Sequence, residues 1–68
     1  MTNQEIGVNI KKIIDERGLK QKYVADKAGF TEDDLSRMIN GYKPIRAEYL
    51  PTIAKVLGVT INDLFGMA

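Results

Sequence analysis

The chain has 68 residues, 44% of them hydrophobic, and a formal net charge of +1 at pH 7, which allows one globular domain with a small core. It contains no cysteine and no histidine, which excludes a disulfide framework and a thiolate metal site and removes the usual zinc ligand and general base. Because the sequence has neither an apolar run near the ~20 residues of a membrane span nor a signal-peptide pattern, we expect a soluble cytoplasmic protein of one domain (residues 1–68), with no membrane partner, cofactor, metal, small-molecule ligand or enzymatic activity.

Five helices are predicted from the apolar periodicity and from the glycines that follow each helical stretch. In chain order they cover about residues 3–17, 20–28, 32 to 39 or 40, 47–57 and 61–65. Gly7 alone among the glycines lies inside a helical stretch. No alternating strand pattern of useful length occurs. We therefore predict an all-α fold, a compact five-helix bundle.

Three of the predicted helix starts carry recognisable signals. The Thr31 hydroxyl is placed to cap the third helix, and Asp34, three residues on, resembles the partner in a capping box. Pro51 lies in the first turn of the fourth helix, where a missing N–H is tolerated. Thr60 is placed to cap the short fifth helix.

One 20-residue window, from Gln21 to Asn40, has the spacing of a helix-turn-helix. Ala25 supplies the small side chain needed where two short helices cross, and Gly29 accepts the left-handed backbone of the turn. The apolar residues that then seal the pair onto the domain are Val24, Ala28, Phe30, Leu35 and Met38. Such a pair presents its second helix outward, in a shape that fits a DNA major groove.

Charge is distributed unevenly around this window. Residues 11–22 and residues 35–47 each carry a net charge of +3, whereas Glu32, Asp33 and Asp34 form an acidic run between them. Basic charge therefore brackets the second helix of the pair, and the opening turn of that helix is acidic.

Taken together, these features resemble the lambda-repressor-like DNA-binding domains of phage repressors, Cro proteins and XRE-type bacterial regulators, over nearly the whole chain. The motifs that carry the resemblance are Ile6-Gly7-x-x-Ile10, Arg17-Gly18-Leu19-x-Gln21, Val24-Ala25-x-x-Ala28-Gly29-Phe30-Thr31, Leu35-Ser36-x-Met38-x-Asn40-Gly41, Pro44, Ile53-Ala54-x-x-Leu57-Gly58-Val59-Thr60 and Asp63-Leu64-Phe65. Their joint spacing is specific, although no single motif is decisive.

The resemblance implies a dimer that binds double-stranded DNA at a two-fold operator, with the third helix in the major groove. Base contacts are implied for four residues, Glu32, Asp33, Ser36 and Arg37. Phosphate contacts are implied for Lys20, Gln21, Thr31, Asn40, Tyr42, Lys43 and Arg46. The apolar residues near the C-terminus form either a lid on the core or a dimer seam, and they are Leu64, Phe65 and Met67.

Several of these residues have a second interpretation. Arg37 either binds a guanine through O6 and N7 or pairs with Asp33 or Asp34 one turn back. Glu32 and Asp33 either accept hydrogen bonds from cytosine N4 amines or satisfy the free N–H groups at the helix start. The simpler interpretation of the phosphate candidates is solvation at the surface, or packing on its own loop for Tyr42. A further alternative is that this face has lost DNA binding.

The leading hypothesis is a phage or bacterial repressor, or another transcriptional regulator, that occupies an operator. The alternative is a protein-interaction module on the same fold, such as an antitoxin or an inhibitor-associated domain, which the acidic turn supports. Salt dependence of binding to random duplex separates the two, because counterion release makes DNA affinity fall steeply with salt.

Overall fold

The computed structural model describes residues 3–66, and its regular elements are all helical, which confirms the predicted fold class. In chain order they are α1 (Asn3–Glu16), α2 (Gln21–Ala28), α3 (Glu32–Ile39), the short 3₁₀ helix η1 (Ala47–Tyr49), α4 (Leu50–Leu57) and α5 (Ile61–Leu64). The predicted boundaries of the first, second, third and fifth helices agree with these to within one residue.

The fourth helix begins differently from the prediction. Residues 47–49 were expected to form its first turn, but they form η1, in which the Leu50 N–H donates to the Ala47 carbonyl. Continuing α-helical bonding would require an N–H at Pro51 for that same carbonyl, and proline has none. The chain therefore tightens into a 3₁₀ turn before α4 starts.

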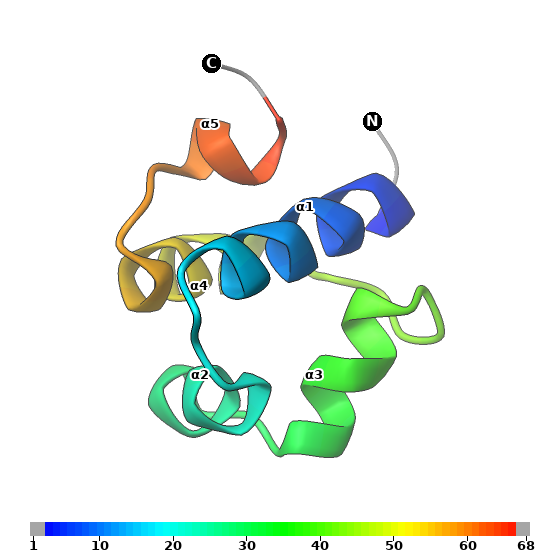
Figure 1. The fold of residues 1–68 in the computed structure, drawn as a ribbon. Coiled ribbons are helices and arrows are strands. Elements are labelled where there is room, and N and C mark those ends of the chain that lie inside the picture. The colour runs from blue at the N-terminus through cyan, green and yellow to red at the C-terminus, as the bar shows by residue number, and fades with distance from the viewer. Residues whose placement is uncertain (1–2, 67–68) are drawn as a thin grey trace.

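The helices stack around α1. In Figure 1, α5 lies on one side of α1 and the pair α2–α3 lies on the other. α1 packs against α3 and α5, while α2 packs against α3 and α4. Within residues 3–66, no helix has the length and apolar character needed to cross a membrane.

One apolar core forms where the helices meet. Its buried side chains are Ile6, Ile10, Ile14, Val24, Ala25, Leu35, Met38, Ile39, Ile45, Leu50, Ile53, Ala54, Leu57 and Leu64. Three of them come from α3, which fixes the inner face of that short helix to the domain. The outer face of α3 is therefore held in place while it remains in solvent.

The backbones of α1 and α3 approach each other closely at Gly7. A Cβ atom at this position would lie 2.6 Å from the Ile39 carbonyl oxygen and 2.9 Å from the Met38 carbonyl oxygen. Any side chain here would collide with backbone rather than with a movable side chain. Gly7 thus sets the distance between α1 and the C-terminal end of α3, a role that the sequence did not reveal.

Candidate functional site

The corner between α2 and α3 has the geometry expected from its sequence. Ala25 is fully buried at the crossing. Gly29 adopts φ +84°, in the left-handed region that glycine occupies without a steric cost. The Phe30 N–H donates to the Ala25 carbonyl at 2.8 Å and the Gly29 N–H to the Asp26 carbonyl at 3.4 Å. These two bonds close the end of α2 as a Schellman motif and turn the chain into α3.

Thr31 caps α3, as predicted, because its Oγ1 accepts from the Asp34 N–H at 3.0 Å. The carboxylate of Asp34, which the sequence suggested as the second half of a capping box, accepts from Lys43 Nζ at 3.1 Å. The reciprocal box forms at α5, where Thr60 and Asp63 exchange bonds of 2.9 and 3.2 Å. The acidic start of α3 therefore reaches a lysine beyond the end of the same helix.

The outer face of α3 carries all four predicted base-contacting residues. Glu32, Asp33 and Arg37 are exposed and Ser36 is half-buried. Glu32, Asp33 and Ser36 line a shallow hollow of about 330 Å³ together with Gln21 at the start of α2. The structure thus brings the predicted phosphate contact of α2 beside the predicted base contacts of α3.

Arg37 is paired in the free chain. Its Nε lies 3.0 Å from Asp33 Oδ2, four residues back on the same helix, and both side chains are largely exposed. The second interpretation of Arg37, an ion pair one turn back, is therefore confirmed for the unbound protein. Exposed pairs at this spacing contribute only about 0.3–0.5 kcal/mol, so the pair opens readily for a competing partner.

The segment after α3 is held against the end of that helix. Gly41 adopts φ +83°, and the N–H groups of Tyr42 and Lys43 both donate to the Arg37 carbonyl, at 2.8 and 3.2 Å. The Tyr42 side chain is 84% exposed, so it does not pack on its own loop. Asn40 donates through its amide to Ser36 Oγ at 3.3 Å.

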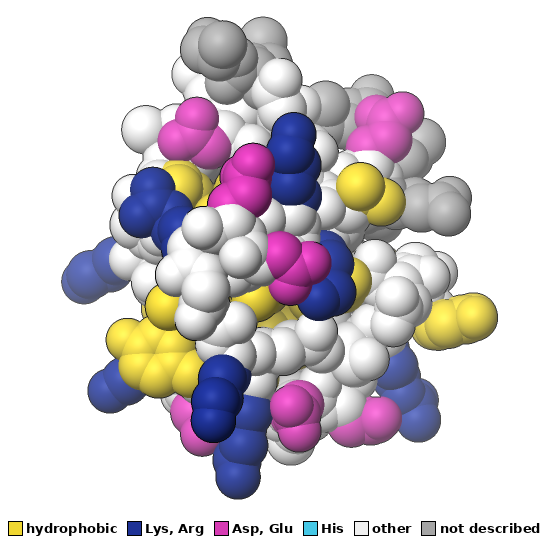
Figure 2. All heavy atoms as spheres, viewed as in Figure 1, with side chains coloured by type: hydrophobic (Ala, Val, Ile, Leu, Met, Phe, Trp, Pro, Cys, Tyr) yellow, Lys and Arg dark blue, Asp and Glu magenta, His cyan; other side chains and the backbone are white. Residues whose placement is uncertain are grey.

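The remaining phosphate candidates lie at helix starts. Lys20 is the N-cap of α2 and Arg46 is the N-cap of η1, and both are exposed. Thr31 is also exposed, although its hydroxyl is engaged in capping α3. At the end of the molecule formed by α2 and α3, Figure 2 shows basic and acidic side chains side by side rather than a uniformly basic surface.

The hydrogen bond from Lys43 lowers the pKa of the Asp34 carboxyl below its usual value of 3.8, and this effect outweighs the opposing effect of desolvation. A pKa that is lower in the folded state stabilises the fold above pH 3.8 and loses that contribution as the pH falls through the folded value. We expect Asp34→Asn to be less stable than the wild type at neutral pH, and the difference to shrink as the pH falls below 3.8. Urea unfolding at each pH measures it, and a difference that does not shrink on acidification would contradict the assignment.

The C-terminal residues divide between core and surface. Leu64 is fully buried within the single chain, so its side chain has no surface for a second chain, and its place in a dimer seam is corrected to a place in the core. Phe65 is half-buried against the same core, and Met67 lies outside the described residues. The exposed apolar side chain on α5 is Ile61, at 38%.

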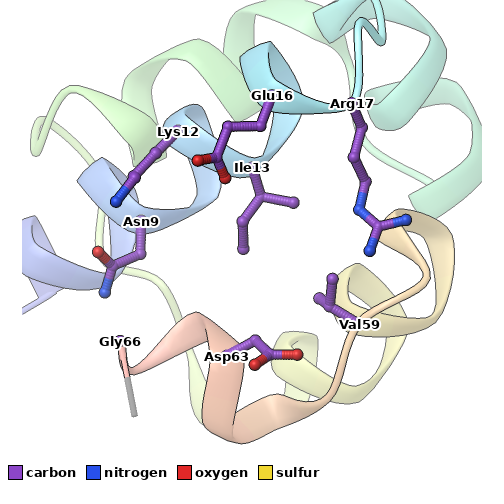
Figure 3. A pocket seen from close by; sticks show the side chains of 8 residues that line it. All are labelled: Asn9, Lys12, Ile13, Glu16, Arg17, Val59, Asp63 and Gly66. Atoms are coloured by element: carbon purple, nitrogen blue, oxygen red, sulfur yellow. The ribbon is translucent and has the colours of Figure 1, made fainter. Parts of the chain in front are cut away.

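A second hollow, of about 370 Å³, lies between parts of α1 and α5. Lys12 and Glu16 of α1, with Arg17 just after it, face Val59 and Asp63 across it (Figure 3). Its charges are mixed, and the Asn9 amide spans the same two helices by donating to the Leu64 carbonyl at 3.0 Å. Among residues 3–66, no group of three or more acidic side chains is arranged to hold a metal ion.

The fold of this chain is also found in known proteins. A family model described as helix-turn-helix matches residues 10–64, whereas no curated protein sequence matches the chain. The solved structure of the clp gene regulator ClgR from C. glutamicum is similar with a TM-score of 0.89, at 19% identity, over 94% of this chain and 83% of that one. The restriction-modification controller protein C.AhdI from Aeromonas hydrophila is similar with a TM-score of 0.86, at 17% identity, over 93% and 96%. Both likenesses confirm the five-helix fold.

Proposed function

The chain belongs to the helix-turn-helix family, and on that basis we propose that it is a transcriptional regulator that binds double-stranded DNA in a sequence-specific manner. The observation that carries this proposal is the outward face of α3, where Glu32, Asp33, Ser36 and Arg37 lie beside the start of α2. ClgR and C.AhdI are named as a gene regulator and a controller protein, which supports the same class of function. The chain would act by occupying DNA in the bacterial cytoplasm and would catalyse no reaction.

In this proposal α3 enters the major groove and reads base edges. Arg37 leaves Asp33 and donates to guanine O6 and N7, the pairing that suits a guanidinium best. Glu32 and Asp33 accept from the N4 amines of cytosines, and Ser36 contacts a neighbouring base edge. Each good base contact discriminates against a wrong base by about 1–3 kcal/mol.

Phosphate contacts would come from both sides of α3. Gln21 lies at the start of α2, and Tyr42 and Arg46 are exposed beyond the end of α3. The full proposed set is Lys20, Gln21, Thr31, Asn40, Tyr42, Lys43 and Arg46. These contacts fix the register of the protein on the duplex but carry no sequence information directly.

We propose that the regulator binds as a homodimer, because one short helix makes too few base contacts for a unique site. Val8 on α1 and Ile61 on α5 are exposed apolar side chains, at 58% and 38%. Both helices lie away from the outer face of α3 in Figure 1, so a second copy seated on them leaves that face free. Two such helices would read half-sites about 34–36 Å apart.

Selection from randomised duplexes with the purified chain tests the proposal. We expect a recovered consensus with two related halves, and an affinity for random duplex that falls steeply between about 50 and 200 mM salt. Recovery of no consensus, together with salt-independent or undetectable duplex binding, would instead favour a protein-interaction module.

Glu32→Gln provides a separate test of direct readout by the acidic turn. If Glu32 accepts from a cytosine amine, this substitution weakens binding to the selected duplex by about tenfold and relaxes the preference at one base pair. Titration against duplexes substituted at single positions measures this. Glu16→Gln, at an exposed position of α1, changes charge equally and should leave the preference unaltered. If the base-pair preference of the Glu32→Gln variant were unchanged, Glu32 would not read a base and would serve only to stabilise the start of α3.

A further inference from the structure

Two of the three basic side chains between residues 35 and 47 are already paired in the free chain. Arg37 Nε lies 3.0 Å from Asp33 Oδ2, and Lys43 Nζ lies 3.1 Å from Asp34 Oδ1. Both carboxylates belong to the first turn of α3. Arg46, the third basic residue, forms no ion pair with any residue in the described range 3–66.

A carboxylate offers these cations the same kind of acceptor that a DNA phosphate offers, an anionic oxygen at hydrogen-bond distance. Each pair must open before its cation can contact the backbone of a duplex. The counterion release that drives non-specific binding is therefore reduced for two of the three cations between residues 35 and 47.

The two pairs differ in how firmly they are held. Asp34 is 39% exposed, and its main-chain N–H is fixed by the Thr31 cap while its carboxylate holds Lys43. Asp33 is 74% exposed, and its recorded partner is Arg37. Opening the Asp33 pair therefore releases both an arginine and a solvated carboxylate on the outer face of α3.

Resting on the proposed function, we propose that Asp33 and Asp34 are specificity-determining residues that suppress binding to random DNA by holding Arg37 and Lys43. On random sequence, the released Asp33 carboxylate faces phosphates and groove acceptors, which repel it. At the correct site it faces a cytosine or adenine amine, which donates to it, while Arg37 gains a guanine. The free energy needed to open the Asp33–Arg37 pair is thus offset by new base contacts at the operator, whereas on random sequence no such contacts form.

The substitution Asp33→Asn tests this, because it removes the charge while keeping the size of the side chain. We expect affinity for random duplex to rise by roughly five- to tenfold at about 0.1 M salt, and the slope of log affinity against log salt to steepen by about 0.9. Affinity for the selected duplex should not rise, so the ratio of specific to random affinity falls. Asp33→Asn combined with Asp34→Asn should raise random-duplex affinity further.

Asp15→Asn is the matched control. Asp15 accepts from Lys11 Nζ at 2.8 Å with the same four-residue spacing, but on α1. This variant adds the same net charge and releases a lysine outside α2–α3. We expect its random-duplex affinity to change by less than about twofold, and thermal unfolding should show all variants to be folded.

The outcomes separate this inference from the function on which it rests. If the wild type binds a selected consensus but Asp33→Asn binds random duplex no better than Asp15→Asn does, the inference is wrong and the regulator assignment stands. If Asp33→Asn raises random and selected affinities equally, the pair limits affinity without setting specificity, and the inference is again wrong. If no variant binds duplex DNA at all, the proposed function fails and the inference fails with it.

Discussion

Replacing Gly7 with alanine is expected to lower the free energy of unfolding by about 1–3 kcal/mol. The added Cβ would lie 2.6 and 2.9 Å from two carbonyl oxygens at the end of α3, and backbone cannot move aside as a side chain can. Overpacking of this kind costs about 1–3 kcal/mol and sometimes more. A 68-residue domain is stable by only roughly 3–10 kcal/mol, so the loss is a large share of the total.

Urea unfolding followed by circular dichroism measures this effect. Val8→Ala is the control, because Val8 neighbours Gly7 on α1 but is 58% exposed, and its change should stay within about 0.5 kcal/mol. If Gly7→Ala were as stable as Val8→Ala, α1 and α3 would not be in the close contact described here.

Replacing Arg37 with alanine is the substitution expected to alter recognition most. A lost bidentate contact to guanine costs about 1–3 kcal/mol, which weakens binding to the selected duplex by roughly five- to 150-fold. Binding to random duplex should fall much less, because in the free chain Arg37 is held by Asp33 at 3.0 Å, and the loss leaves only the repulsion of the unpaired Asp33 carboxylate. The preference for guanine at one base pair should disappear.

Fluorescence anisotropy with a panel of singly substituted duplexes measures both quantities. Lys55→Ala, an exposed lysine on α4, removes the same charge from outside α2–α3 and should preserve the base preference. An equal loss of affinity on every sequence would make Arg37 a phosphate contact rather than a reader of bases.

The parts of the fold that the sequence predicted are those set by local chemistry. Gly29 predicts the turn before α3 because glycine readily adopts a left-handed backbone, and Thr31 predicts the N-cap because its hydroxyl can accept a main-chain N–H. Both residues act as predicted. The pairing of Asp33 with Arg37 was one of two interpretations, because residues four apart on a helix are neighbours.

The parts that the sequence did not predict depend on contacts between distant segments. Gly7 is needed because the Ile39 carbonyl, at the end of α3, lies directly against it, and these two residues are far apart in the sequence. Asp34 bonds Lys43 because the Gly41 turn folds the chain back along α3. Leu64 is buried because α5 packs against α1 and α4, whereas its sequence pattern fits a lid and a seam equally well.

The sequence predicted which residues make up the candidate site, but not which of its charged side chains are paired in the free chain. Glu32, Ser36 and Gln21 share one hollow, as a reading helix beside a phosphate contact requires. The spacing of the residues could not establish that Lys43 as well as Arg37 would be paired in the free chain. That state depends on side-chain positions across the whole of α3 and the following loop.

In the proposed function, the outer face of α3 is the surface that meets DNA. Amide NMR shifts recorded while the ¹⁵N-labelled chain is titrated with its selected duplex test this most directly. We expect the largest changes at Gln21, along residues 32–37 and across residues 40–46, with the α1–α5 side changing far less. Changes centred on α1 and α5, with α3 unaffected, would contradict the account.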